Sequence, residues 1–110
     1  MTTTLTVQPR YFDAISNGSK TIEGRIAKDK YMTLENGHCI EFRDAATNHA
    51  IKKRVVRVET FPTFDAMLRQ SGVSAFGLSG SIEEAVAVYH SFGDYKNDEE
   101  KYGVAAIHIR

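Results

Sequence analysis

The sequence has little of the material from which cross-linked or membrane-spanning proteins are built. Its 110 residues include one cysteine, two prolines and no tryptophan. The single cysteine, Cys39, excludes an internal disulfide and favours a reducing compartment. No stretch approaches the ~18 apolar residues of a membrane-spanning helix, and residues 1–4 lack the features of a signal peptide. We therefore expect a cytoplasmic protein with no membrane partner.

The chain also lacks net charge, with 14 basic and 14 acidic residues. This balance argues against a protein held on nucleic acid by bulk charge alone. The charges are unevenly spread, because residues 1–57 are net basic and residues 58–110 are net acidic. Lys53 and Arg54 lie in a basic run at 52–57 and are candidate ligand-binding residues for a phosphate backbone. A solvated charge run on an edge strand is the alternative explanation.

Metal and cofactor signatures are missing as well. The four histidines, His38, His49, His90 and His108, show none of the spacings of a metal site, and Cys39 alone adds little to one. There is no glycine-rich phosphate loop either. We expect no metal and no cofactor.

The ordinary globular composition and the length predict one domain over residues 1–110. Apolar periodicity and turn signals predict strands at 4–8, 20–26, 38–43, 51–60 and 104–109. Helices are expected at 9–17, after a cap at Thr63, and after a capping box that begins at Ser81. Residues 72–80 and 93–100 are expected to be loops. Because strands and helices do not alternate, the pattern predicts a small α+β domain with a curled or closed sheet.

The segment from Asn17 to Arg25 carries the richest chemistry. It brings an ammonium, a hydroxyl, a carboxylate and a guanidinium together within six residues, at Lys20, Thr21, Glu23 and Arg25. Such groups can bind a polar, planar molecule. The same groups can also form surface ion pairs worth about 0–1 kcal/mol. In a regular strand Lys20 faces away from Glu23 and Arg25, so joint action requires Lys20 to lie in the preceding turn or a bulge to turn it.

The pattern Gly18-x-Lys20-Thr21-x-Glu23-x-Arg25 resembles the signature of ASCH domains, which belong to the PUA-like superfamily. The segment Phe61-Pro62-Thr63-Phe64 and the ending at 99–104 are also similar to small ASCH proteins. The resemblance implies an α+β fold, namely a PUA-like β-barrel of about five to six strands flanked by short helices. One departure is Gly37-His38, where the family often has Gly-Asp.

The resemblance further implies binding of RNA or of a modified nucleoside in a cleft lined by the Lys20–Arg25 segment. One ASCH branch hydrolyses N4-acetylcytidine with a lysine, a threonine and a glutamate. Lys20 matches that lysine, but Glu23 stands at the threonine, and residues 76–80 contain no acid to match the glutamate. A metal-independent hydrolase acting on a nucleoside or on RNA is therefore the alternative to a binding module.

Roles can be assigned to the candidate residues under both hypotheses. Lys20 is a candidate base or nucleophile if burial lowers its pKa, and Glu23 could orient water or accept from a base's amino group. Thr21, Arg25 and Tyr102 are candidate ligand-binding residues. Tyr31 and Tyr95 are weaker candidates for stacking on bases. A domain that binds only another protein remains a third possibility.

Overall fold

A curled sheet of five strands forms the centre of the protein, in the spatial order β1-β3-β4-β5-β2. The computed structural model describes residues 2–110. The strands are β1 (Thr2–Val7), β2 (Ile22–Ile26), β3 (Cys39–Asp44), β4 (Ala50–Phe61) and β5 (Val104–Ile109). β1 is parallel to β3, and the other neighbouring strands are antiparallel. Because β1 and β2 lie at the two ends of this order, the sheet is an open half-barrel.

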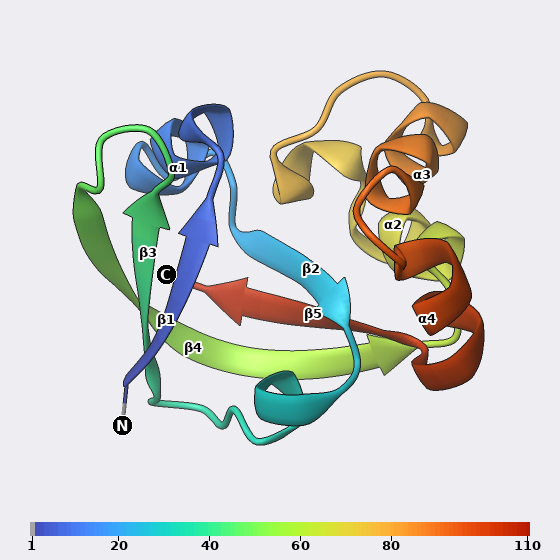
Figure 1. The fold of residues 1–110 in the computed structure, drawn as a ribbon, viewed down its shortest axis with the longest axis horizontal. Helices are drawn as coiled ribbons and strands as arrows, with labels where there is room; N and C mark the ends of the chain where they lie inside the picture. Colours follow the sequence, from blue (N-terminus) through green and yellow to red (C-terminus); the bar gives the residue numbers. More distant parts are fainter. Residues whose placement is uncertain (1) are drawn as a thin grey trace.

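Helices cover both ends of the half-barrel (Figure 1). They are α1 (Pro9–Ser16), α2 (Phe64–Ser71), α3 (Ile82–His90) and α4 (Tyr95–Tyr102), with short 3-10 helices η1 (Asp29–Met32) and η2 (Val73–Phe76). Figure 1 shows α2, α3 and α4 gathered at one end of the sheet and α1 near the other. The α+β class and the number of strands expected from the sequence are confirmed. Within residues 2–110, no helix has the length and apolar character needed to span a bilayer.

β4 is the strand that bends the sheet. Its first half pairs with β3 and its second half pairs with β5, and the register shifts between Val55 and Arg57. Such an irregularity increases the local twist of a strand. The basic run at 52–57 therefore lies on an interior strand, so the edge strand assumed in the alternative explanation of this run is wrong.

Two hydrophobic clusters share β5 as a common wall. One fills the half-barrel beneath α1, where Ile107 packs with Phe12 and Phe42. The other joins the sheet to α2 and α3, where Val104 and Ala106 pack with buried side chains such as Phe64 and Met67. Alternate residues of a strand point to opposite faces, so β5 contributes to both clusters and is buried along almost its whole length.

The structure corrects the expected loops. Residues 93–100 include most of α4, a polar helix that hydrophobic periodicity could not reveal, since it contains no fully buried residue. Tertiary contacts stabilise it: the Tyr95 ring stacks 5.9 Å from the Phe64 ring, and Glu99 Oε2 accepts a hydrogen bond from the Phe64 N–H at 2.6 Å. Tyr102 is the last residue of α4, and the last strand begins two residues later, at Val104. Residues 72–80 contain η2.

The predicted capping box at the start of α3 is confirmed. The Glu84 N–H donates to Ser81 Oγ at 3.1 Å, and the Ser81 N–H donates to Glu84 Oε1 at 2.9 Å. Two N–H groups at the helix start, which have no partner within the helix, are thereby satisfied.

Ser81→Ala is expected to lower the free energy of unfolding by about 0.5–2 kcal/mol, because the substitution removes the cap. Urea denaturation followed by circular dichroism measures the change. Ser79→Ala is the matched control, because this exposed serine lies just outside the capping box, and it should change stability by less than about 0.5 kcal/mol. Equal effects of the two substitutions would contradict a capping role.

Candidate functional site

A recess of about 190 Å³ is lined by both edge strands of the half-barrel and by α3. Its charged lining residues are Lys20, Glu23 and Arg25. Its aromatic lining residues are Tyr11, Phe76, Tyr89, Phe92 and Tyr95. The three charged groups that the sequence singled out therefore share one recess.

Lys20 reaches this recess because it lies outside β2. α1 ends near Gly18, whose φ of +84° is a backbone conformation that favours glycine. The chain then turns, with the Lys20 N–H donating to Ala14 O, and β2 begins only at Ile22. The alternation of side chains along a strand therefore does not apply to Lys20. Lys20 lies in the turn before the strand, which is one of the two arrangements that would let it act together with Glu23 and Arg25.

The Lys20 ammonium is buried and donates to three acceptors. Its Nζ lies 2.9 Å from Ile22 O, 2.7 Å from Phe76 O and 3.1 Å from Glu23 Oε1. An ammonium has three N–H donors, so these contacts occupy all of them. The contact with Phe76 O holds η2 against the start of β2. A backbone hydrogen bond from the Thr21 N–H to Ala75 O does the same.

Glu23 lies between two cations. Oε1 faces Lys20, and Oε2 accepts from Arg25 Nε at 2.7 Å. Arg25 also donates through Nη1 to Tyr31 Oη at 3.3 Å, and its guanidinium carbon lies 5.6 Å from the centre of the Tyr31 ring. The side chain of Arg25 is 18% exposed, compared with 8% for Glu23 and 3% for Lys20. Arg25 is therefore the member of this charged triad (Lys20, Glu23, Arg25) that a ligand reaches most easily.

The charged forms of Glu23 and Arg25 stabilise each other. Burial alone would raise the pKa of Glu23, but the charges of Lys20 and Arg25 outweigh burial, so this pKa lies below its usual value. Burial would lower the pKa of Arg25, whereas Glu23 opposite raises it, and the net change is upward. Burial raises the pKa of Tyr89 and of Tyr95, so both hydroxyls stay protonated at neutral pH.

Aromatic rings form much of the wall above the triad. Tyr89 stacks on Phe64 with ring centres 4.3 Å apart and an interplanar angle of 4°, which fixes one side. Gly24 makes room for this packing: a Cβ at that position would lie 2.7 Å from Tyr89 Oη. Tyr11 also lines the recess, and Lys20 Nζ lies 5.5 Å from its ring centre. Flat rings around a polar floor suit a planar ligand.

A second, more open recess of about 440 Å³ adjoins the first and shares Phe92 and Tyr95 with it. It is lined by charges of both signs, among them Lys28 and Asp98, which form an ion pair at 3.3 Å. A ligand longer than one ring could extend in this direction past the shared aromatic side chains.

Four of the seven catalytic and ligand-binding candidates do not line the first recess, and neither does the stacking candidate Tyr31, which lines the second. Thr21 has an exposed side chain, and Tyr102 lies at the end of α4, 42% exposed. Lys53 and Arg54 lie on β4, where they pair with Ile40 and Cys39 of β3. The structure thus gathers Lys20, Glu23 and Arg25 but not these four.

Sequence reasoning missed Tyr11, Tyr89 and Phe92 as lining residues. The sequence did mark Tyr89, because this residue falls on the apolar stripe of α3, but an apolar stripe predicts core packing and not a place in a binding site. Tyr11 and Phe92 come to the recess through the folding of α1 and of the end of α3 onto the sheet. For a metal site, residues 2–110 contain no group of three or more His, Cys, Asp or Glu side chains close enough to share an ion.

An open, curled five-stranded sheet with helices at its ends and a charged recess beside its edge strands defines a PUA-like half-barrel domain. The sequence pattern of the ASCH domain matches residues 5–110, and the chain belongs to the ASCH domain family. Among curated proteins, none matches this chain.

Solved structures agree with this assignment. The crystal structure of a hypothetical protein, PH0355, is 33% identical and superposes with a TM-score of 0.88, over 100% of this chain and 98% of that one. The solution structure of PF0455 from Pyrococcus furiosus is also 33% identical, with a TM-score of 0.79 over 100% and 96% of the chains. A mutant of ZmASCH from Zymomonas mobilis is 15% identical, with a TM-score of 0.70 over 99% and 68%, and shares the fold.

Glu23→Gln is expected to lower the free energy of unfolding at pH 7 by about 3–5 kcal/mol, because it leaves two buried cations without their anion. The folded pKa of Glu23 lies below the value of 4.5 expected when unfolded, so its stabilisation is complete above that pH and is lost as the pH falls through the folded pKa. Wild type and variant should therefore converge in acid. Urea denaturation between pH 3 and pH 7 measures both effects.

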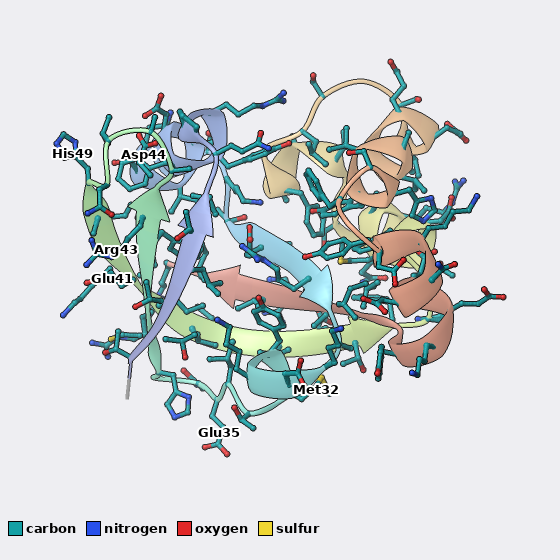
Figure 2. All side chains as sticks on the ribbon, viewed as in Figure 1. Met32, Glu35, Glu41, Arg43, Asp44 and His49 are labelled. Carbon is teal, nitrogen blue, oxygen red and sulfur yellow. The ribbon has the colours of Figure 1, made fainter. Side chains whose placement is uncertain are left out.

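Glu41→Gln is the matched control, because Glu41 pairs with Arg43 at 2.8 Å on the outside of β3, away from α2–α4 (Figure 2). It should cost about 0–1 kcal/mol. A Glu23→Gln cost as small as this, or one independent of pH, would contradict the role of the triad in stability.

Lys20→Met is expected to loosen η2, because it removes the hydrogen bond from Nζ to Phe76 O while keeping an apolar stem. A hydrogen bond from a charged group contributes about 1.5–3 kcal/mol, so amide exchange in residues 73–80 should speed up roughly ten- to hundred-fold. Hydrogen exchange with peptide mass spectrometry measures this. Lys53→Met is the control and should leave amide exchange in residues 73–80 unchanged. Equal exchange rates of this segment in the two variants would contradict the role of Lys20 in holding η2.

Proposed function

We propose that this ASCH domain binds RNA or a modified nucleoside in the recess formed by Lys20, Glu23 and Arg25. The supporting observation is the combination of a buried triad of net charge +1 with aromatic walls. Aromatic side chains stack on bases of any sequence, and a guanidinium is a fixed set of hydrogen-bond donors.

Arg25 is the residue that contacts the ligand in this proposal. A guanidinium has five N–H groups, and Glu23 and Tyr31 engage Nε and Nη1, so donors remain for a ligand. The ion pair with Glu23 fixes the orientation of these donors before binding, which lowers the entropic cost of recognition. Lys20 and Glu23 position Arg25 and close the floor of the recess.

A hydrolase acting on a nucleoside or on RNA is the second candidate, supported by the position of Lys20 within the recess. Two observations favour binding over catalysis. The three N–H groups of Lys20 all have acceptors, and among the described lining residues no carboxylate other than Glu23 is available as a general base.

Titration of the protein with a short single-stranded RNA and with N4-acetylcytidine, followed by calorimetry and by chromatography of products, separates the candidates. We expect binding without turnover, and Arg25→Met should weaken binding roughly ten- to hundred-fold, because it removes charge-assisted hydrogen bonds. Arg54→Met, which changes an exposed arginine outside the recess, is the control and should have little effect.

Two results would overturn the binding proposal. Turnover that disappears in Lys20→Ala, while circular dichroism still shows a folded protein, would favour the hydrolase. If binding survives in Arg25→Met but is lost in Arg54→Met, the ligand binds to the outer face of β4 and not in the recess.

A further inference from the structure

The polar groups around the recess differ in what they can recognise. Tyrosine hydroxyls and the Gln8 amide can each donate or accept, so these side chains do not distinguish a carbonyl from an amino group. Among the lining side chains within residues 2–110, three can play only one of these two roles. Lys20 and Arg25 can only donate, and Glu23 can only accept while it is ionised.

Lys20 and Glu23 already use their hydrogen-bonding groups within the protein. The donors of Lys20 are taken by two carbonyl oxygens and by Glu23. Each oxygen of Glu23 receives a charge-assisted bond, from Lys20 at 3.1 Å and from Arg25 at 2.7 Å. A neutral amino group on a ligand would have to compete with two cations for that carboxylate, in a side chain that is only 8% exposed. Glu23 is therefore poorly placed to select an amino group.

Arg25 is the one of these three residues that still has N–H groups available to a ligand. Its side chain is the most exposed of the three, and Nε and Nη1 point to Glu23 and Tyr31, which fixes the guanidinium plane and leaves other N–H groups of the fork for a ligand. A fixed guanidinium pairs well with acceptor atoms on the edge of a base and leaves an amino group opposite it without a partner.

We infer that the recess selects planar heterocycles that present an exocyclic carbonyl oxygen, rather than an amino group, to Arg25. The inference rests on the proposed function and specifies its ligand class: 4-oxopyrimidines over 4-aminopyrimidines, and 6-oxopurines over 6-aminopurines. Glu23 acts in this selection as a positioning residue, because it orients the guanidinium and does not itself contact the ligand.

Two pairs of nucleosides test the inference on the wild-type protein by calorimetry. Uridine is compared with cytidine, and inosine with adenosine, since the members of each pair differ only at the exocyclic group and the adjacent ring nitrogen. The oxo member of each pair should bind about five- to hundred-fold more tightly, the range that a good side-chain–base pair provides. Arg25→Met should abolish the difference, whereas Arg54→Met should preserve it.

The outcomes separate this inference from the proposed function. Equal affinities, or tighter binding of cytidine and adenosine, overturn the inference while binding itself stands. No binding of any of the four nucleosides or of short RNA overturns both. The comparison on wild type decides the preference without a variant, so an Arg25→Met protein that fails to fold does not remove the test.

Discussion

The buried contact between the Lys20 ammonium and Glu23 is the interaction on which the site depends. It joins the turn after α1 to the adjacent edge strand β2, and the same ammonium reaches, through Phe76 O, the η2 segment, which is 56 residues away in sequence. Burying charges is costly unless each is paired and hydrogen-bonded. Here the arrangement meets that condition, because Lys20 has three acceptors and each oxygen of Glu23 has a cation. The recess is consequently rigid at its floor, where the polar chemistry lies.

This rigidity bears on what kind of site it is. A general base or nucleophile needs a proton or a lone pair that can move. Here the three N–H groups of Lys20 all have acceptors, and the neighbouring cations keep Glu23 in its charged form. A preformed floor with one accessible donor group suits recognition, because little order has to be imposed when the ligand arrives. The aromatic walls then provide the contact surface for the flat ligand, and Arg25 provides the hydrogen bonds that orient it. Shape and polarity are thus contributed by different elements: the aromatic walls by α1, η2, α3 and the start of α4, and the charged floor by β2 and the turn before it.

Local sequence signals were enough to predict the strands, the cap of α2 and the capping box of α3, and to single out Lys20, Glu23 and Arg25, because each depends on neighbours within a few residues. They left open whether Lys20 shares a cleft with the other two. They could not predict α4, whose polar sequence carries no periodicity and whose stability comes from Tyr95 and Glu99 contacting Phe64, over thirty residues away in sequence. They also could not show that β4 is interior or that Tyr102, Lys53 and Arg54 lie away from the recess. Those facts are set by strand order, which the 2-residue period of a strand does not encode.

The position of β5 in the sheet determines when the domain can form. This strand comes last in the chain, yet it lies between β4 and β2 and contributes side chains to both hydrophobic clusters. Before residues 104–109 emerge during synthesis, β2 has no partner strand and neither cluster is complete. The earlier elements therefore lack a complete core on their own, and the domain acquires its structure only once residues 104–109 are available. Contacts of such long sequence separation are formed slowly, because a large loop must be closed first.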